Sequence, residues 1–368
     1  MISLHSPLPR LFFRQGLPLH LIFFVTAKCN LACQHCFYWS RLNRKSSPLT
    51  LPQIKKISRS LGRLYWLALT GGEPFLRPDL GEIASTFIRN NRVKHLSIPT
   101  NGWLTEHIRA ETEKIVSAHP ATGFSVTVAC DGLEKTHDRL RGKKGSFRKA
   151  IATVQRLKQI KAANLGVGIV FTLNQTNQNQ AMDTYTYLRD QVKPDDIIIN
   201  LVRGEPKKAS LTKVDLKYYR QLTDQKIADL RSGRLPYYRL GLVGKAAAAR
   251  DAVMYRRISH LNRPSVPLLP CLAGRLSAVI NETGDVFPCE LLKQSFGNLH
   301  EVNYNFKKLW ENSKAKQIRR QIKLSRCRCT HECFLTTNIL FSPKTYPQLL
   351  WQLLKLNSPL FPTSRRPL

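Results

Sequence analysis

Short apolar runs alternate with segments of helical periodicity along the first two thirds of the chain. The run LHLIFFVTA at 19–27 precedes a helical pattern at 50–62, and YWLALTGG at 65–72 precedes one at 79–90. Four more apolar runs are predicted strands, at 93–102, 123–132, 164–174 and 195–204, with helices at 146–160, 177–191 and 213–231. Near-continuous apolar strands separated by helices are typical of an α/β protein whose parallel sheet is buried on both faces.

Most of the predicted strands end in loops rich in cysteine, glycine or polar residues, such as TGGEP, PTNG and CDG. The carboxyl ends of the strands form the active site in βα barrels, so we expect the chemistry at these loops. The alternation of strands and helices stops near residue 235. We therefore divide the chain into a barrel at 1–235 (core about 19–231), a helical linker at 236–265, a small cysteine-rich domain at 266–340 and a tail at 341–368.

The chain is strongly basic, with 58 Lys and Arg against 24 Asp and Glu and a formal net charge of +34. Such a charge would attract RNA, an anionic membrane surface or an anionic substrate. The basic residues are spread over the whole chain, which favours a generally basic surface over a nucleic-acid groove. Nucleic acid is therefore not an expected partner, and a non-catalytic RNA-binding or scaffold protein is kept as an alternative.

Both ends of the chain carry apolar segments. The run at 17–25 follows basic residues as a secretion signal would, but it leads directly into a cysteine-rich loop, so we interpret it as a strand. No run reaches the roughly 18–20 apolar residues of a membrane-spanning helix. We therefore expect a cytoplasmic protein. The Leu- and Trp-rich tail is expected to dock on the protein's own core, with peripheral membrane contact as the alternative.

The nine cysteines fall in tight groups that favour metal binding over disulfides. Cys29, Cys33 and Cys36 form a Cys-x3-Cys-x2-Cys loop directly after the first predicted strand. Three thiolates suit a [4Fe–4S] cluster with one iron left open, or a zinc site completed by His35 or a remote ligand. The ligand that completes this metal centre, a small molecule on the open iron or a fourth side chain on zinc, decides the function.

The TGGEP segment at 70–74 supplies the second half of the pattern. Gly71 and Gly72 allow close backbone approach, and Glu73 can accept hydrogen bonds from an ammonium group. The cysteine triplet together with GGEP resembles the radical S-adenosylmethionine (radical SAM) superfamily. The resemblance implies a partial (βα)6 TIM-type barrel. In such enzymes the amino and carboxylate groups of S-adenosylmethionine chelate the fourth iron. Reductive cleavage of this cofactor gives a 5′-deoxyadenosyl radical that abstracts a hydrogen atom from the substrate.

Further residues are assigned by the same resemblance. Asn101 of PTNG and Arg141 would contact the cofactor, Arg141 at its carboxylate, and His35 would lie near the adenine. The block ACDGLEKTHDRLRG at 129–142 is similar to the family's Ser-x-Asp-Gly block, but Ala129 stands at the serine position, so that hydroxyl contact is missing. If Ala129 faces the barrel interior, strand alternation places Cys130 in the core, and a catalytic hydrogen donor is the alternative for this cysteine. The same alternation leaves Asp131 as either a substrate contact or a turn former.

The C-terminal cysteines resemble the SPASM/twitch extension of radical SAM enzymes, a small α+β domain that holds an auxiliary [4Fe–4S] cluster. The family's full pattern has seven cysteines, whereas five are present here. Two short strands joined by the turn NETGD are expected at 271–289. The expected ligands are Cys271, Cys289 and Cys333 with either Cys327 or Cys329. A zinc-ribbon-like site is the alternative.

The combined resemblance predicts a radical SAM oxidoreductase or maturase that acts on a peptide or protein. Radical modification of a small-molecule, carbohydrate or lipid-linked natural-product precursor is the alternative. The expected partners are the substrate and an electron donor such as flavodoxin or ferredoxin.

Overall fold

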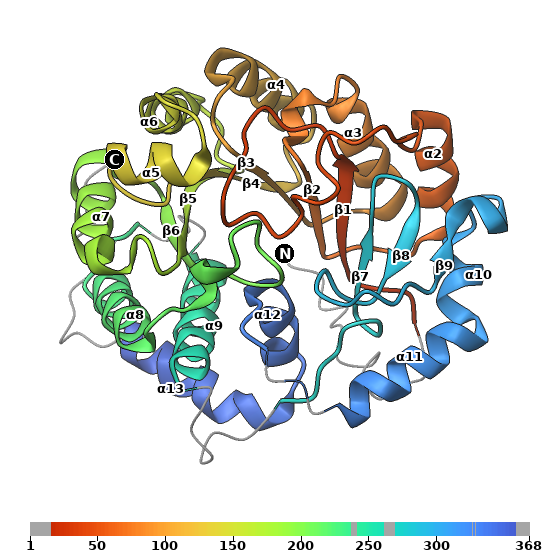
Figure 1. Cartoon of the computed structure of the whole chain (residues 1–368). Coiled ribbons are helices and arrows are strands. Elements are labelled where there is room, and N and C mark those ends of the chain that lie inside the picture. The colour runs from red at the N-terminus through yellow and green to blue at the C-terminus, as the bar shows by residue number, and fades with distance from the viewer. Residues whose placement is uncertain (1–15, 237–240, 261–268, 326, 328, 358–368) are drawn as a thin grey trace.

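Six parallel strands form the centre of the computed structural model, which describes residues 16–236, 241–260, 269–325, 327 and 329–357 (Figure 1). The strands are β1 (His20–Thr26), β2 (Trp66–Gly71), β3 (His95–Thr100), β4 (Gly123–Ala129), β5 (Leu165–Leu173) and β6 (Asp196–Leu201). Each of the six predicted strands is found. The segments 1–15, 237–240 and 261–268, which include the start of the chain and parts of the expected linker, lie outside the described residues.

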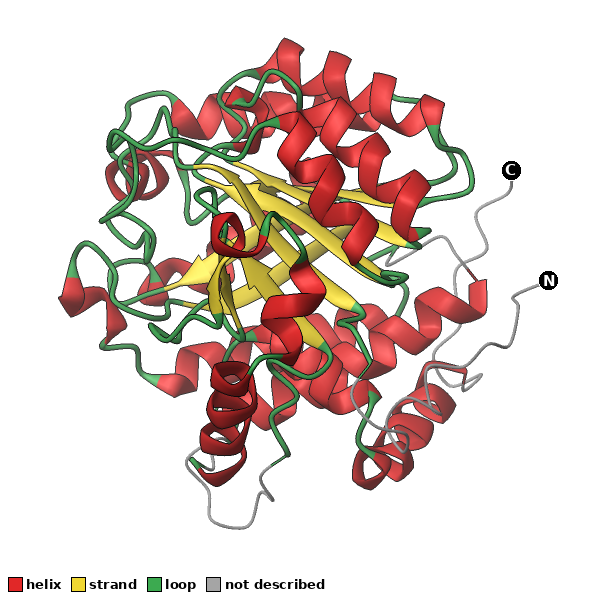
Figure 2. Cartoon of the chain, turned by 90° about the vertical axis from the view of Figure 1, so that its right-hand side faces the viewer, coloured by secondary structure: helices red, strands yellow, loops and turns green. Residues whose placement is uncertain are grey.

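Helices cover the outer face of this sheet (Figure 2). They are α2 (Leu51–Ser60), α3 (Leu80–Asn91), α4 (Thr105–Ala118), α5 (Glu134–Arg141), α6 (Ser146–Lys158), α7 (Ala181–Tyr187, followed by a π-helical turn at Leu188–Val192), α8 (Leu216–Arg231) and α9 (Gly241–Ser259). Successive residues of β1 point to opposite faces of the sheet and belong to two different apolar clusters. Leu21 and Phe23 pack with the helices in the main core, whereas Ile22 and Phe24 belong to a second cluster on the inner face of the sheet.

The C-terminal region continues the same sheet, which the sequence did not predict. Its elements are β7 (Ser277–Ile280), β8 (Asp285–Phe287), β9 (Gly297–Asn298), α10 (Phe306–Glu311), α11 (Ser313–Leu324), α12 (Glu332–Leu340) and α13 (Tyr346–Asn357). Strand β7 pairs in parallel with β1, so nine strands follow the order β6-β5-β4-β3-β2-β1-β7-β8-β9. The predicted hairpin is confirmed, because β7 and β8 are antiparallel on either side of the NETGD turn.

Helix α12 occupies the open side of the curved sheet, between β6 and β1 (Figure 1). Phe334 of α12 packs with Ile22 and Phe24 on the inner face of β1. At the other edge, the backbone N–H of Leu201 in β6 donates to Glu332 of α12 at 3.4 Å. This arrangement brings the C-terminal cysteines to the inner side of the partial barrel. Within the described residues, no helix is long and apolar enough to cross a membrane.

Candidate active site

The loop that carries Cys29, Cys33 and Cys36 leaves the carboxyl end of β1 and is held on both sides by backbone hydrogen bonds. The N–H of Gln34 donates to Leu140 of α5 at 2.8 Å, and the N–H of Lys208, beyond β6, donates to Gln34 at 2.8 Å. The loop is therefore fixed between two neighbouring elements of the barrel rim.

The three thiols of this loop form an all-sulfur donor set. All three cysteines are half-buried, and burial raises the pKa of Cys29 to about 11 and that of Cys36 to about 12. Within the described ranges no three His, Cys, Asp or Glu side chains are grouped to hold a single metal ion. An iron–sulfur cluster does not require the three thiolates to converge on one ion, because each thiolate binds its own iron. Soft thiolates are suitable ligands for such a cluster. The donor set therefore fits the predicted cluster.

Gly71 and Gly72 bring the end of β2 against the start of the cysteine loop. A Cβ atom at Gly71 would lie 2.2 Å from the carbonyl oxygen of Thr26, and one at Gly72 would lie 2.2 Å from that of Lys28. The N–H of Gly72 donates to Thr26 at 2.8 Å, and the N–H of Glu73 to Lys28 at 2.8 Å. The close approach that glycine allows is thus to the chain's own backbone. Contact of these residues with the cofactor stays a prediction.

Glu73 is a buried carboxylate that fixes the end of β3. Its Oε1 accepts from Thr100 Oγ1 at 2.8 Å and from the N–H of Phe75 at 3.3 Å, and its Oε2 accepts from the N–H of Asn101 at 2.7 Å. Burial raises the pKa of Glu73 to about 7. Of these three hydrogen bonds, Oε2 accepts one, so this oxygen can accept another from an ammonium group.

Asn101 is nearly buried and also binds the cysteine loop. Its Nδ2 donates to Asn30 Oδ1 at 2.8 Å, and its Oδ1 accepts from the N–H of Trp103 at 2.9 Å. Asn101 therefore ties the β3 loop to the cysteine loop. Its predicted contact with the cofactor stays a prediction.

Arg141, at the end of α5, lies beside the cysteine loop and is paired with Asp131. Its Nη2 is 2.5 Å from Asp131 Oδ2, and its Nη1 is 3.6 Å from Cys33 Sγ. Burial alone would raise the pKa of Asp131, but the Arg141 guanidinium lowers it below the ordinary value. Asp131, which the sequence left between two roles, is therefore the buried counter-ion of Arg141.

His35 lies on the other side of Asp131, with its Nε2 3.4 Å from Asp131 Oδ2. Burial lowers the pKa of His35 to about 4, so the ring is neutral near pH 7. His35 Nδ1 and Arg141 Nε are buried without a hydrogen-bond partner among the described residues. These two nitrogens are suited to a polar cofactor at the positions predicted for S-adenosylmethionine.

Cys130 lies in the main hydrophobic core and is 1% exposed, which confirms that it faces the helices. Ala129 lies half-buried on the opposite, inner face of β4. The alternation predicted for this strand end is correct, and Cys130 has a structural place.

Three C-terminal cysteines gather where β8 and α12 approach the inner face of β1. Cys271, Cys289 and Cys333 pack against the same apolar cluster as Phe37 and Tyr38 of the first cysteine loop. The first cysteine loop and these three cysteines therefore contact one small apolar cluster.

Cys329 is the better placed of the two remaining C-terminal cysteines. Cys329 is half-buried and raises the pKa of Cys289, whereas Cys327 is exposed. The structure thus favours Cys329 as the fourth auxiliary ligand, and the assignment stays a prediction.

Two ion pairs beside these cysteines were not predicted. Glu290 hydrogen-bonds His331 Nε2, and Arg203, beyond β6, lies 2.6 Å from Glu332. Burial opposes the charge of Glu290, but His331 and Arg203 lower its pKa below the ordinary value. The sequence pointed to these residues only by their position next to cysteines, since Glu290 follows Cys289 and Glu332 precedes Cys333.

The NETGD turn contacts the first cysteine loop directly. Glu282 is buried, accepts a hydrogen bond from Tyr38 and is paired with Arg41 at 3.2 Å. Its backbone oxygen accepts from the N–H of Leu49 at 2.8 Å. The C-terminal region and the first cysteine loop are thus joined by a buried carboxylate.

The inner face of the sheet presents small and polar side chains that are only half-buried. Ser97 of β3 is in register with Ala68 of β2 and Ser125 of β4, and Gly166 of β5 follows in the same row. The opposite faces of these strands carry the large apolar residues of the core. Of this row, Ala68 packs against the same apolar cluster as Cys271, Cys289 and Cys333.

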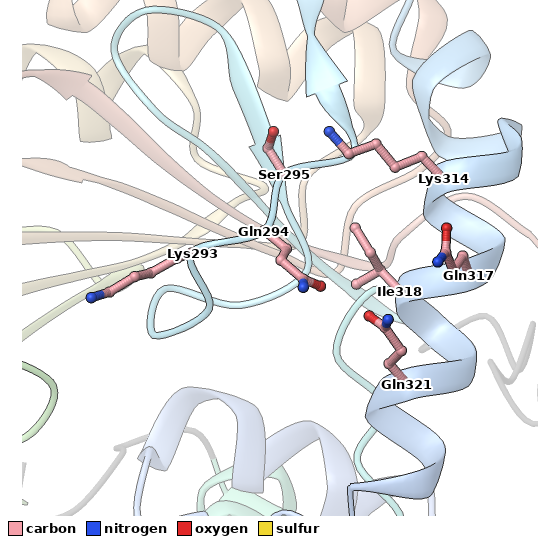
Figure 3. A pocket seen from close by; sticks show the side chains of 7 residues that line it. All are labelled: Lys293, Gln294, Ser295, Lys314, Gln317, Ile318 and Gln321. Atoms are coloured by element: carbon pink, nitrogen blue, oxygen red, sulfur yellow. The ribbon is translucent and has the colours of Figure 1, made fainter.

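A separate surface hollow of about 310 Å³ lies between α11 and the segment 293–295 (Figure 3). Its lining includes Ile318 and Gln321 of α11 together with Lys293 and Lys314. No cysteine lines it. It is distinct from the thiol groups.

Comparison with known proteins gives two family matches. Residues 23–188 match the model of the Radical SAM superfamily, and residues 271–334 match that of SPASM, an iron–sulfur cluster-binding domain. Together the two matches take in well over half of the chain.

Individual relatives are more distant. The AdoMet-dependent heme synthase of Methanosarcina barkeri is 27% identical over 301 residues, which are 78% of this chain and 81% of that protein. Mycofactocin maturase MftC of Mycobacterium tuberculosis is 27% identical over 320 residues, 84% of this chain and 75% of that protein. The crystal structure of Streptococcus suis SuiB bound to precursor peptide SuiA matches with a TM-score of 0.60 and 17% identity, covering 91% of this chain and 75% of SuiB. At that identity, the likeness to SuiB shows the fold alone.

Proposed function

The chain belongs to the radical SAM superfamily and carries a SPASM iron–sulfur cluster-binding domain, and from this we propose that it is a maturase that modifies a peptide or protein. Membership in an enzyme superfamily favours catalysis over the RNA-binding or scaffold alternative. Its cofactors are S-adenosylmethionine, a [4Fe–4S] cluster and an auxiliary iron–sulfur centre.

The proposed ligands of the first cluster are Cys29, Cys33 and Cys36. When bound, the cluster and S-adenosylmethionine supply the 5′-deoxyadenosyl radical that removes a hydrogen atom from the substrate. The chain's own contribution is to bind, orient and shield. Glu73 Oε2 is proposed to accept from the amino group of the cofactor, and Arg141 to bind its carboxylate.

Asp131 and His35 support this arrangement. The carboxylate of Asp131 keeps the Arg141 side chain oriented beside Cys33, where a free guanidinium would have several rotamers. The neutral His35 ring presents Nδ1 as a hydrogen-bonding atom near the proposed adenine position. The proposed auxiliary ligands are Cys271, Cys289, Cys329 and Cys333.

One observation carries the proposal: Phe37 and Tyr38 of the first cysteine loop and three C-terminal cysteines pack on the same apolar cluster, which includes Ile22 and Phe24 on the inner face of the sheet. A substrate on that face would lie within reach of both centres. A peptide is favoured because an extended chain can place one side chain into a narrow site while the rest stays outside. MftC, a maturase, and SuiB, solved with a precursor peptide, support this choice.

Radical modification of a small-molecule precursor is the second candidate. The similarity to the AdoMet-dependent heme synthase favours a tetrapyrrole among such molecules. A tetrapyrrole offers carboxylates that would need cationic partners. Arg203, a cation close to the second thiol group, would have to exchange its pairing with Glu332 to bind one.

The remaining parts of the proposal concern partners and location. A reduced electron-transfer protein such as flavodoxin or ferredoxin is proposed to supply the electron, and the proposed location is the cytoplasm. Both follow from oxygen-sensitive, thiolate-bound iron–sulfur chemistry, which requires a reducing compartment.

The substrate class is tested with anaerobically reconstituted protein, S-adenosylmethionine and dithionite. Short peptides encoded beside the gene and an iron porphyrin are added separately, and 5′-deoxyadenosine and substrate mass are followed. The proposal predicts faster nucleoside formation and a mass change with a peptide, both absent in Cys289→Ala. Turnover of the porphyrin with no change in any peptide would favour the second candidate.

A further inference from the structure

Helix α13 carries three of its large apolar side chains on the side that faces solvent, whereas Leu349 and Leu356 pack against the main core. It packs on α9 and α8 at the lower edge of the molecule in Figure 1. Leu350, Trp351 and Leu354 are 61%, 55% and 65% exposed. Their spacing places all three within one arc of about 100° on the helix surface. These three residues are called the α13 apolar face.

The inner side of the same helix includes a polar residue where an apolar one would be expected. Gln352 is 4% exposed, and its Oε1 accepts from Arg231 Nη2 of α8 at 3.0 Å. Leu349 and Leu356 dock α13 on the core, so a helix with no other task would not need an exposed tryptophan and two exposed leucines on its opposite side. Packing among the described residues therefore does not account for the exposure of the α13 apolar face.

Cationic side chains lie on α13, just before it and on the adjoining helix α9. Lys355 Nζ lies 4.7 Å from the centre of the Trp351 ring, and Lys344 is exposed just before the helix. On α9, Arg256 is exposed and Arg257 donates to Gln348 of α13 at 3.0 Å. An acidic side chain, Asp224, interacts with Arg231 on the α8 side.

The charged residues in the sequence around α13 are all basic. Residues 333–368 contain no Asp or Glu, and the whole chain has a formal net charge of +34. Positive charge draws a protein toward an anionic surface from a distance, and exposed leucine and tryptophan then enter the interface between headgroups and acyl chains. Lysines beside them keep their charged ends in water.

From these observations we infer that the α13 apolar face binds the surface of an anionic lipid bilayer. A second copy of the chain is the weaker fit, since a stable dimer buries about 20–30 residues on each side and this face offers three. The inference is independent of the proposed function, because neither thiol set contributes to α13.

The test is co-sedimentation of the reconstituted enzyme with vesicles of phosphatidylcholine alone or with about 30% phosphatidylglycerol. A protein of this charge will bind anionic vesicles to some extent at low salt, so binding is also measured near 0.5 M salt, where screening weakens the charge effect. The informative variant is Leu350→Ser with Leu354→Ser, which keeps every charge. Met182→Ser removes a side chain that is 38% exposed on α7 and serves as the matched control.

The proposal predicts binding to the anionic vesicles and a blue shift of tryptophan emission that is lost in Trp351→Phe. The double leucine variant should bind at least about tenfold more weakly at both salt concentrations, while Met182→Ser binds as the wild type does. Equal melting temperatures of all variants show that folding is unchanged. Binding unaffected by the double substitution, or a dimer in sedimentation equilibrium that the substitution dissociates, would overturn the inference.

Discussion

At the scale of single residues, the buried pair between Asp131 and Arg141 does most to shape the site. Asp131 is fully buried, accepts from the N–H of Thr172 at 2.8 Å and holds Arg141 beside Cys33. The sequence identified Arg141 by resemblance but could not give Asp131 a role. The two residues are on different elements, and local patterns do not report which side chains meet.

Replacing Asp131 with Asn should destabilise the protein and weaken cofactor binding. Removing one member of a buried ion pair costs about 3 kcal/mol, because the other charge stays buried without its partner. We expect a lower melting temperature and a Kd for S-adenosylmethionine about tenfold higher. Glu134→Gln breaks the exposed pair with Arg148, 2.7 Å apart, and should cost less than about 1 kcal/mol. An Asp131→Asn variant with unchanged cofactor affinity would show that Asp131 does not orient Arg141.

Buried histidines predict how stability depends on pH. Burial lowers the pKa of His95 to about 4 from an ordinary value of 6.5, and its Nε2 is 3.0 Å from Ser125 Oγ. Below pH 6.5 the unfolded chain binds a proton that the folded ring does not, so stability falls as pH drops from about 6.5 to about 4. Melting temperatures between pH 7.5 and 5.5 measure this, and His95→Gln should show the smaller decrease. Parallel curves for the two proteins would contradict the assignment.

At the scale of elements, the contact between the end of β2 and the start of the cysteine loop positions the site. Gly71 adopts a φ of 135°, and neither it nor Gly72 has room for a Cβ atom. The sequence predicted that these glycines permit close approach, but the partner is the backbone of Thr26 and Lys28. Sequence alone does not distinguish approach to a ligand from approach to another strand.

Gly72→Ala should displace the β2 end and lower the cluster content of the protein. The added Cβ would lie 2.2 Å from the oxygen of Lys28, one residue before Cys29. Iron content and 5′-deoxyadenosine formation should both fall at least about tenfold, since a displacement near 1 Å is enough to disable a positioned site. Gly62→Ala, whose nearest neighbours are at ordinary contact distance, is the control. Wild-type iron content in Gly72→Ala would mean that the loop does not depend on this contact.

Elements with many apolar residues were predicted correctly from the sequence, whereas a polar helix and the pairing between distant strands were not. The six parallel strands are found because each is a near-continuous apolar run. Helix α5, EKTHDRLR, was not recognised because so few of its residues are apolar, although it delivers Arg141. The pairing of β7 with β1 was also missed. The wholly buried SAVI segment shows that β7 can be an inner strand but not which edge it joins.

At the scale of the whole molecule, the first cysteine loop and three C-terminal cysteines, about 250 residues apart in sequence, meet at one apolar cluster. The sequence predicted both groups and their chemistry by resemblance. It could not predict that Glu282 would join them or that α12 would lie across the open side of the sheet. Such contacts depend on how complete elements pack, which requires the three-dimensional structure.

The two groups should bind metal independently. Cys289→Ala is expected to lower iron from about eight to about four atoms per chain, because each [4Fe–4S] cluster holds four. Cleavage of S-adenosylmethionine should persist, since Cys29, Cys33 and Cys36 are unchanged. Iron and sulfide analysis with nucleoside assay measures both effects. Loss of all iron in this variant would mean that the two centres assemble as one unit.

The central claim is that the β1 loop holds a cluster that cleaves S-adenosylmethionine. The most direct test is anaerobic reconstitution followed by 5′-deoxyadenosine measurement with S-adenosylmethionine and dithionite, for the wild type and for Cys33→Ala. We expect nucleoside from the wild type and at least about a hundredfold less from the variant, because a cluster missing one of its three protein ligands is not retained. A wild-type protein that binds zinc in place of iron, or equal nucleoside from both proteins, would contradict the central claim.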